Sequence, residues 1–589
     1  MPVTESSAAE PGSDGRRKTR AGRRPRASPL PEDEQESVAA QALNSILGAN
    51  PFIGIDPVRV LADATAWLGR IVARPDLVVA QSRKVALGLV EIARGRSEIA
   101  PARGDRRFTD PTWNEHPVYR RLMQAYLLIA ATMHELVDQA ELDWRNAQRA
   151  HFAVTLLTDA LAPTNTLLGN PAAVKRAFDT AGVSLIRGTR NLISDLSRNG
   201  GMPSMVDTRP FQLGRNIAVT PGAIVHRDEV FELIQYSPTT ETVHPRPVVM
   251  IPPQINKYYV MDLAPGRSFT GYAVDQGFQY FTISWRNPSA AQSDWDLDTY
   301  VQACLDAVDV ASEITGSEDA NLLGLCAGGV TMSLLLGHLA AQGSPKARSA
   351  TFAVAVLDTE APSMMGMFAS DATIAAVTRR SRRKGVLDGS EMARVFAWLR
   401  PNDLVWNYWV NNYLLGNDPP AFDILFWNAD NTRLPAALHA AFLDLFVRNP
   451  LKRPGEVEVL GTPIDLKQVA TPTYVVSGIT DHIAPWTAGY ETTKMLGGQV
   501  EFVLSSSGHI QSIVNPPGNP KASYFIGGHN ADEPQSWLKA ATEVRGSWWE
   551  HWARWVAEQA GERVRAPRRL GSRKHPVLEP APGRYVFTR

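Results

Sequence analysis

Cys326 lies in the pattern Gly-x-Cys-x-Gly, between Gly324 and Gly328. An apolar run precedes this pattern, and a helix-like run over residues 330–341 follows it. The arrangement is typical of a nucleophile elbow, a sharp strand-to-helix turn that exposes a reactive side chain above a sheet, here with sulfur in place of the usual oxygen. A buried cysteine beside a glycine turn would give the same pattern. The partners available to Cys326 therefore decide between the two interpretations.

A thiol nucleophile needs a base to take its proton, and the base needs a group that orients it. Asp481 follows a strand predicted at residues 474–477, and His509 follows another predicted at residues 502–504. The order nucleophile, acid, histidine is the order of α/β-hydrolases, in which the acid follows a late strand and the histidine lies in the last loop. We therefore predict a catalytic triad of Cys326, Asp481 and His509.

Other side chains compete for these roles. Asp358 also ends a predicted strand and remains an alternative acid. His482 adjoins Asp481, and because neighbouring side chains point in different directions we expect it to pack within its loop. His338 and His439 fall in helical runs and are expected to be structural.

An oxyanion hole requires two backbone N–H donors close to the nucleophile. One donor is the N–H of the residue after the nucleophile, which is Ala327, and the other comes from the loop after the third strand of the sheet. That loop is predicted at residues 252–256, where the first two residues are prolines and lack an N–H. Gln254 or Ile255 is therefore the candidate second donor.

The composition of the 589 residues is that of an ordinary globular protein, with 44% hydrophobic and 20% charged residues. Lys and Arg number 60 and Asp and Glu also number 60, so no overall field points to nucleic acid or to an anionic membrane. The chain has only 2 cysteines, which excludes a disulfide framework and fits a reducing compartment. Cys304 has apolar neighbours at helical spacing and is expected in the core. Without a Cys-x-x-Cys or His/Cys cluster, no metal site is predicted.

Targeting signals are also absent from the sequence. No apolar run reaches the roughly 18–20 residues of a transmembrane helix. The N-terminal region is rich in arginine, but no apolar segment follows it, as a secretory signal would require. We therefore expect a cytoplasmic protein.

Sequence patterns divide the chain into four parts. Residues 1–38 are rich in Pro, Gly, Ser, Arg and Glu and predict a disordered basic tail. Residues 39–215 have helical periodicity and predict a helical N-terminal domain, whereas residues 216–572 alternate strands with helices, which is typical of a parallel sheet. This alternation stops over residues 359–469, where aromatic-rich helical sequence predicts a cap inserted over the active site. Residues 573–589 are expected to be a C-terminal tail.

The predicted fold class is therefore α/β: an α/β-hydrolase fold with an inserted helical cap and a helical N-terminal domain. Amphipathic runs predict N-terminal helices at residues 77–94, 119–140 and 172–196. Short apolar runs predict strands at residues 223–225, 231–236, 247–251, 280–285, 322–325, 352–357 and 473–477.

From about Asn50 to the C-terminus, the sequence resembles the polyhydroxyalkanoate synthases. The resemblance is nearest to class II, whose members polymerise medium-chain substrates without a second subunit, and residues 401–409 and 461–469 carry it. One difference is Gly324, because the class II box lacks this first glycine. The stretches that carry the wider resemblance are residues 105–113, 161–165, 235–236, 252–259, 284–288, 324–328, 481–486 and 508–510.

The resemblance implies an acyltransferase that polymerises (R)-3-hydroxyacyl-CoA into polyhydroxyalkanoate polyester, with release of CoA and through an acyl-cysteine on the triad. It implies a homodimer at the surface of a polymer granule, and no cofactor besides the coenzyme A thioester substrate. Sulfur suits this chemistry because exchange of one thioester for another costs little and leaves the acyl group activated. Two alternatives stay open: a polyester or lactone hydrolase with a cysteine nucleophile, and a non-catalytic granule-surface protein.

Overall fold

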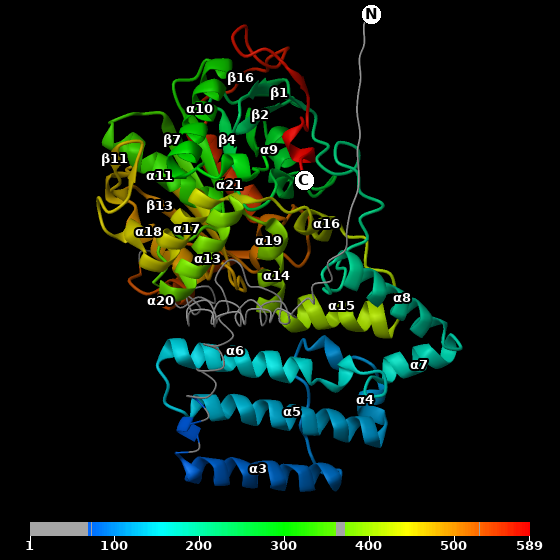
Figure 1. Ribbon diagram of the computed structural model, residues 1–589. Coiled ribbons are helices and arrows are strands. Elements are labelled where there is room, and N and C mark those ends of the chain that lie inside the picture. The colour runs from blue at the N-terminus through cyan, green and yellow to red at the C-terminus, as the bar shows by residue number, and fades with distance from the viewer. Residues whose placement is uncertain (1–66, 68, 72, 361–370, 529–530) are drawn as a thin grey trace, which may run out of the picture. The chain divides into compact units, whose positions relative to one another are not determined.

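The computed structural model describes residues 67, 69–71, 73–360, 371–528 and 531–589 (Figure 1). Contacts divide the chain into two units, and all of these residues belong to the second, residues 48–589. The tail predicted at residues 1–38 lies outside the described residues, as does the beginning of the predicted helical domain.

The centre of the fold is an 11-stranded sheet in the order β15-β14-β13-β12-β7-β6-β4-β5-β2-β1-β17. The strands from β5 to β13 in this order run parallel, and the strands beyond them on both sides are antiparallel. The strands are β1 (Gly222–Arg227), β2 (Phe231–Tyr236), β4 (Val248–Ile251), β5 (Tyr280–Trp285), β6 (Ala320–Leu325), β7 (Ala347–Ala353), β12 (Thr473–Gly478), β13 (Val500–Ser505), β14 (Ser523–Ile526), β15 (Thr542–Arg545) and β17 (Glu579–Pro580).

Helices cover both faces of this sheet, which is why its central strands are buried along their whole length. Side chains of α10 (Leu297–Thr315) and α11 (Ala327–Ala341) form one apolar cluster with alternate sheet residues such as Leu322. The intervening residues, such as Leu323, pack with α9 (Phe269–Asp275) and α21 (Trp548–Gln559) in a second cluster. The two faces thus follow the period-2 alternation of the strands.

Most predicted strands coincide with observed ones, but β7 does not. The apolar run predicted a strand at residues 352–357, whereas β7 covers Ala347–Ala353. The first half of β7 is more polar, and its buried Ser349 donates a hydrogen bond of 2.6 Å to Asn321. The strand ends before Val354, whose positive φ of 47° breaks the extended conformation.

The N-terminal helices differ from the prediction in two places. The helix predicted at residues 172–196 is two helices, α7 (Pro171–Asp179) and α8 (Val183–Arg198), because Ala181 and Gly182 adopt positive φ angles of 48° and 83°. The helix α6 (Trp144–Ala160) was not predicted. It packs beside α5 (Pro117–Asp138), which in turn packs beside α3 (Pro75–Ala93), as Figure 1 shows. A short helix, α4 (Thr112–Glu115), precedes α5.

The insertion between β7 and β12 is mainly helical. Two short two-stranded ladders lie within it, β8 (Val386–Leu387) with β9 (Leu434–Pro435), and β10 (Glu458–Val459) with β11 (Thr462–Pro463). Its described helices are α13 (Asp371–Lys384), α14 (Gly389–Leu399), the π-helix η5 (Asn402–Trp406), α15 (Asn407–Trp409), the π-helix η6 (Val410–Leu414), α16 (Asp423–Ala429) and α17 (Ala436–Arg448).

The insertion, predicted as a cap over residues 359–469, is bonded to other parts of the chain in several places. In η6, Tyr413 donates a 2.7 Å hydrogen bond to Asp195 of α8, so this part is tied to the N-terminal helices. At the other end, the backbone N–H of Leu460 donates to Asp298 of α10, and Ile464 packs against Gly337 of α11. The last part of the insertion therefore belongs to the body of the sheet domain.

Residues 573–589 are not the predicted tail. Their strand β17 pairs with β1 at the edge of the sheet, and Val586 is only 1% exposed in the second apolar cluster. The backbone N–H groups of Arg584 and Tyr585 donate to the buried carboxylate of Glu232. The pattern was missed because the segment is short and rich in Arg and Pro.

The remaining elements complete the sheet domain. The pair β3 (Thr242–Val243) and β16 (Val564–Arg565) lies outside the main sheet. The helices α18 (Trp486–Met495), α19 (His509–Ile513) and α20 (Pro534–Ala540) follow β12, β13 and β14. Across the part of the chain that the structure describes, we find no helix with the length and apolar character needed to span a bilayer.

Candidate active site

Cys326 occupies the turn between β6 and α11, where the Gly-x-Cys-x-Gly pattern predicted it. Its φ and ψ are 50° and −121°, a conformation that side-chain-bearing residues rarely adopt. The surrounding structure holds it there, because the Cys326 N–H donates a 2.9 Å hydrogen bond to the carbonyl of Ala353 in the next strand. Strain of this kind concentrates at functional sites. The thiol is partly exposed at the carboxyl edge of the sheet.

The glycines of the pattern are required by close packing around the turn. A Cβ on Gly324 would lie 2.6 Å from the Cα of Gly329, and a Cβ on Gly328 would lie 2.2 Å from the carbonyl oxygen of Ile251. The first turn of α11 therefore presses against the end of β4. This contact sets how near the helix N-terminus lies to the loop that follows β4.

His509 and Asp481 come together beside the elbow. The Nδ1 of His509 lies 2.6 Å from Oδ2 of Asp481, and the other carboxylate oxygen accepts hydrogen bonds from the N–H groups of Ile483 and Ala484 at 2.9 and 2.8 Å. The Asp481 side chain is fully buried. The Cys326 side chain lies close enough to His509 to raise the pKa of the imidazole. The three residues predicted from order and spacing therefore meet at the carboxyl ends of β6, β12 and β13.

This environment favours a protonated imidazole. Burial alone lowers the pKa of His509, but the Asp481 carboxylate and the Cys326 side chain together outweigh that effect. The pKa of His509 is raised from 6.5 to about 10. A histidine held between an acid and a thiol can thus keep the proton that the thiol gives up.

The competing side chains are engaged elsewhere. Asp358 accepts a 2.7 Å hydrogen bond from Asn449 and forms an ion pair with Lys452 at 3.2 Å, so its partners are in the insertion. His482 is kept neutral, because burial and, secondly, Arg400 lower its pKa to about 4.

The two helical histidines and the second cysteine have structural surroundings. His338 hydrogen-bonds Thr462 at 2.9 Å and His439 hydrogen-bonds Ser381 at 3.0 Å. Cys304 is fully buried, and burial raises the pKa of its thiol. Within the described ranges, no three His, Cys, Asp or Glu side chains are grouped to hold a metal ion.

The loop after β4 lies beside the elbow, as an oxyanion loop should. Ala327 is the first residue of α11, so its N–H has no partner within the helix. The Gln254 side chain donates to Thr331 of α11 at 2.9 Å, so it is held against this helix. Ile255 is partly buried against the core. Ala327 with Gln254 or Ile255 therefore remains the predicted donor set.

Comparisons with known proteins decide what kind of site this is. Residues 104–273 match a family model described as the N-terminus of poly-beta-hydroxybutyrate polymerase (PhaC), and residues 247–516 match the alpha/beta hydrolase fold. The chain is 49% identical over 554 residues to poly(3-hydroxyalkanoate) polymerase 1 of Ectopseudomonas oleovorans, covering 94% of this chain and 99% of the relative. The chain belongs to the poly(3-hydroxyalkanoate) polymerase family. It is thus an acyltransferase, as the family resemblance implied, with the α/β-hydrolase fold that the sequence motifs predicted.

Two further members of the polymerase family have similar coverage. Poly(3-hydroxyalkanoate) polymerase 2 of E. oleovorans is 50% identical over 509 residues, which cover 86% of this chain and 90% of the relative. The polymerase subunit PhaC of Cupriavidus necator is 42% identical over 552 residues, with 92% of each chain covered. The aligned part of the chain is longer than the parts that the two family models match, and it includes the insertion.

Sequence reasoning missed the residues that hold the loop after β4 of this polymerase. Thr432 of the insertion donates to the carbonyl of Gln254 at 2.8 Å, and the indole of Trp285 donates to the carbonyl of Pro252 at 2.9 Å. Lys257 and Asp430 form an ion pair that is almost fully buried. One signal was present in the sequence, because Lys257 directly precedes two tyrosines and a charge beside such large side chains needs a partner when it is buried.

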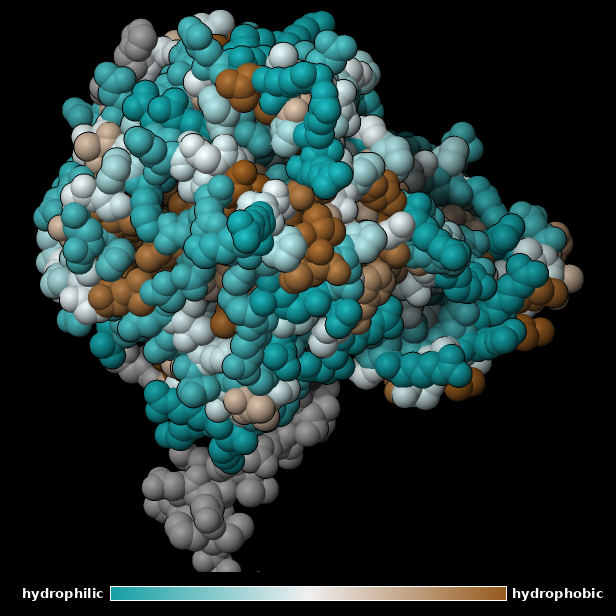
Figure 2. All heavy atoms as spheres, turned by 90° about the horizontal axis from the view of Figure 1, so that it is seen from above, coloured by the Kyte–Doolittle hydropathy of each residue, from teal (hydrophilic) through white to brown (hydrophobic). Residues whose placement is uncertain are grey.

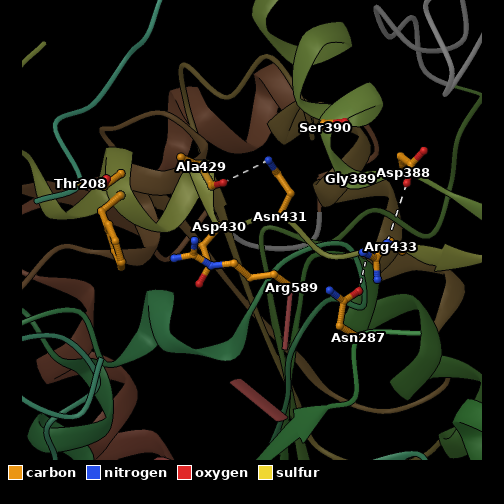
Figure 3. A pocket seen from close by; sticks show the side chains of 11 residues that line it. Thr208, Asn287, Asp388, Gly389, Ser390, Ala429, Asp430, Asn431, Arg433 and Arg589 are labelled. Carbon is orange, nitrogen blue, oxygen red and sulfur yellow. Dashed lines mark hydrogen bonds and ion pairs between the residues drawn. The ribbon is translucent and has the colours of Figure 1, made fainter. Parts of the chain in front are cut away.

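A cavity of about 330 Å³ lies next to this loop (Figure 3). Its lining residue Asn431 forms a β-bridge with Asn256 of the loop. In Figure 3, Arg433 lies between Asp388 of the insertion and Asn287, which follows β5. None of the three predicted triad residues lines this cavity, so it is a separate hollow on the insertion side of the loop.

Proposed function

We propose that this chain polymerises medium-chain (R)-3-hydroxyacyl-CoA into polyhydroxyalkanoate and releases CoA, with Cys326 as the nucleophile. The observation that carries the proposal is the buried, hydrogen-bonded pair of His509 and Asp481 beside Cys326 in a polymerase-family chain. The preference for medium-chain acyl groups rests on the sequence resemblance to class II.

Acylation begins when His509 takes the thiol proton and the sulfur of Cys326 attacks the thioester carbonyl. The negative charge on the carbonyl oxygen would be held by the N–H of Ala327 and that of Gln254 or Ile255. As the intermediate collapses, the carbon–sulfur bond to CoA breaks and His509 returns the proton to the departing CoA thiolate. Asp481 holds the imidazole orientation and stabilises its positive charge throughout.

Elongation uses the same residues, and Cys326 is now the leaving group instead of the nucleophile. The 3-hydroxyl of a second hydroxyacyl unit attacks the acyl-cysteine, and His509 takes the hydroxyl proton as general base. An ester bond forms while the bond from the acyl carbon to Cys326 breaks, and the thiolate regains its proton from His509. Each step exchanges acyl groups without a change of oxidation state, so we propose that no cofactor is needed.

We further propose that the protein works in the cytoplasm as a homodimer at the surface of its polyester granule. Exposed apolar side chains on the N-terminal helices support contact with an apolar surface, among them Phe178 at 87% and Ile186 at 71% exposure. Figure 2 shows one face of the molecule, where hydrophobic side chains form separate small groups among hydrophilic ones. Contact through several such groups would be weaker than insertion into a bilayer.

Replacing Cys326 by alanine tests the central proposal. The wild-type protein should release CoA from (R)-3-hydroxydecanoyl-CoA and form insoluble polyester, and Cys326→Ala should do neither while keeping the thermal unfolding midpoint of the wild type. Free hydroxy acid in place of polyester would identify a hydrolase, and CoA release by the alanine variant would exclude Cys326 as the nucleophile.

A further inference from the structure

The loop after β4 (residues 252–257) has to present a backbone N–H to the thioester oxygen if the proposed function is right. Backbone donors act well only when they are held in place before charge develops. The loop contains no regular secondary structure, apart from the single bridge at Asn256. Its position must therefore come from contacts with its neighbours.

Contacts with the sheet domain fix the first half of the loop. Gly328 packs against the backbone of Ile251 and Pro252, and Gln254 donates its side-chain N–H to Thr331, both from the α11 side. The indole of Trp285 holds the Pro252 carbonyl. These contacts restrain the loop where it leaves β4 and leave its second half to be held from elsewhere.

The insertion holds the second half of the loop through Trp427 and Asp430. Nζ of Lys257 lies 2.9 Å from Oδ1 of Asp430, and the side chains are only 4% and 9% exposed. Oδ2 of Asp430 accepts a 2.8 Å hydrogen bond from the hydroxyl of Tyr259. The indole of Trp427 donates to the Lys257 carbonyl at 2.7 Å. Together with the bond from Thr432 to the Gln254 carbonyl, these contacts bond both ends of the loop's second half to the insertion.

A third element completes this arrangement. Nζ of Lys257 also donates to the carbonyl of Val586 at 2.6 Å, so the C-terminal segment shares the same ammonium group. Lys257 is therefore bonded to a carboxylate of the insertion and a carbonyl of the C-terminal segment at once. A buried ammonium needs such partners, since an uncompensated buried charge is strongly unfavourable.

We propose that the buried Lys257–Asp430 ion pair positions the backbone of residues 254–255 as the second oxyanion donor. Lys257 and Asp430 are positioning residues in this proposal, because neither touches the reacting atoms. The pair makes the donor position depend on the insertion and on the C-terminal segment. Loss of the pair should weaken binding of the oxyanion while leaving binding of the CoA portion unchanged.

The first test is Asp430→Asn, which removes the charge but keeps an acceptor for Tyr259. We expect kcat for CoA release to fall by about 10- to 100-fold, a part of the effect of deleting an oxyanion donor. KM for (R)-3-hydroxydecanoyl-CoA should stay within about twofold, because the ground-state carbonyl gains little from the hole. An unchanged kcat in a folded variant would overturn the proposal.

Two substrate analogues distinguish a loss of donor positioning from a general loss of active-site structure. A trifluoromethyl ketone analogue of the acyl-CoA adds to Cys326 and places an oxyanion in the hole, whereas a thioether analogue lacking the carbonyl does not. Asp430→Asn should weaken the ketone by the same factor as kcat/KM and leave the thioether unchanged. Equal weakening of both analogues would contradict a role at the oxyanion.

Asp319→Asn is the control. Asp319 forms an ion pair with Arg246 at 2.5 Å, and the two side chains are 16% and 33% exposed. Arg246 and Asp319 precede β4 and β6, so this pair lies at the amino edge of the sheet, opposite the loop. The thermal midpoint of Asp319→Asn should fall because the pair is lost, but kcat and ketone affinity should not change. A matching loss of kcat would show that any destabilising change has this effect.

Tyr259→Phe is the second test and replaces the first if Asp430→Asn does not fold. It removes a single hydrogen bond to the Asp430 carboxylate and should give the same split between kcat and KM, about two- to tenfold in size, because only part of a charge-assisted hydrogen bond is felt at the donor. Wild-type turnover and Cys326→Ala are measured alongside. Full activity of Cys326→Ala would refute the proposed function, whereas normal kcat in Tyr259→Phe would refute only the ion-pair proposal.

Discussion

At the scale of single residues, sulfur at position 326 fits acyl transfer better than hydrolysis. The acyl-cysteine remains a thioester, so the incoming hydroxyl attacks an activated carbonyl. Cys326→Ser should lower the rate of CoA release by about 100-fold or more, because a hydroxyl is a weaker nucleophile than a thiolate and its ester is less activated. The measurement is initial CoA release with equal amounts of folded protein. Wild-type activity in the serine variant would show that sulfur chemistry is unimportant here.

The raised pKa of His509 has a consequence for stability. Its pKa is 6.5 when unperturbed and about 10 in the folded protein, so its ion pair with Asp481 stabilises the fold fully below pH 6.5. That contribution is lost as the pH rises from about 6.5 through 10, because the unfolded state gives up its proton first. Urea unfolding at pH 6, 8 and 10 should show the advantage of wild type over His509→Gln shrinking with pH. A constant difference would contradict the raised pKa.

At the scale of elements, the packing of α11 on β4 fixes the geometry of the elbow. Gly328→Ala would place a Cβ against the carbonyl of Ile251, a backbone atom that cannot move aside cheaply. We expect about 1–3 kcal/mol lower stability, as in other overpacked sites, together with lower kcat. Gly88→Ala in α3 is the control, since its Cβ meets only the end of the Leu128 side chain. Denaturant unfolding and CoA release measure both, and equal effects would refute the argument.

The elements that the sequence predicted best are those with one clear pattern of apolar residues. The buried run 231–236 became β2 without a change of boundary, and order along the chain was enough to find Asp481 and His509. Local pattern failed where tertiary contacts decide the structure. β7 starts with polar residues because Ser349 bonds Asn321 in the neighbouring strand, and the Lys257–Asp430 pair joins residues that lie far apart in sequence. No periodicity reports such contacts.

At the scale of the whole molecule, the active-site region depends on parts remote in sequence. The insertion holds the loop after β4, the N-terminal helices hold the insertion through Tyr413 and Asp195, and the C-terminal segment holds Lys257. The aromatic residues of the insertion reflect this, since Trp409 donates to the Asn165 carbonyl of the N-terminal region. Much of the aromatic sequence predicted as a cap is therefore used to join parts of the chain.

The C-terminal segment offers the sharpest test of that dependence, because neighbouring residues differ in burial. Val586 is 1% exposed within the second apolar cluster, whereas Phe587 is 53% exposed. Val586→Ala should lower the free energy of unfolding by about 1–3 kcal/mol through lost burial and a small cavity. Phe587→Ala, the larger truncation, should change it by less than about 0.5 kcal/mol, as surface substitutions usually do. Urea unfolding decides between a packed segment and a tail, because a tail would leave both variants as stable as wild type.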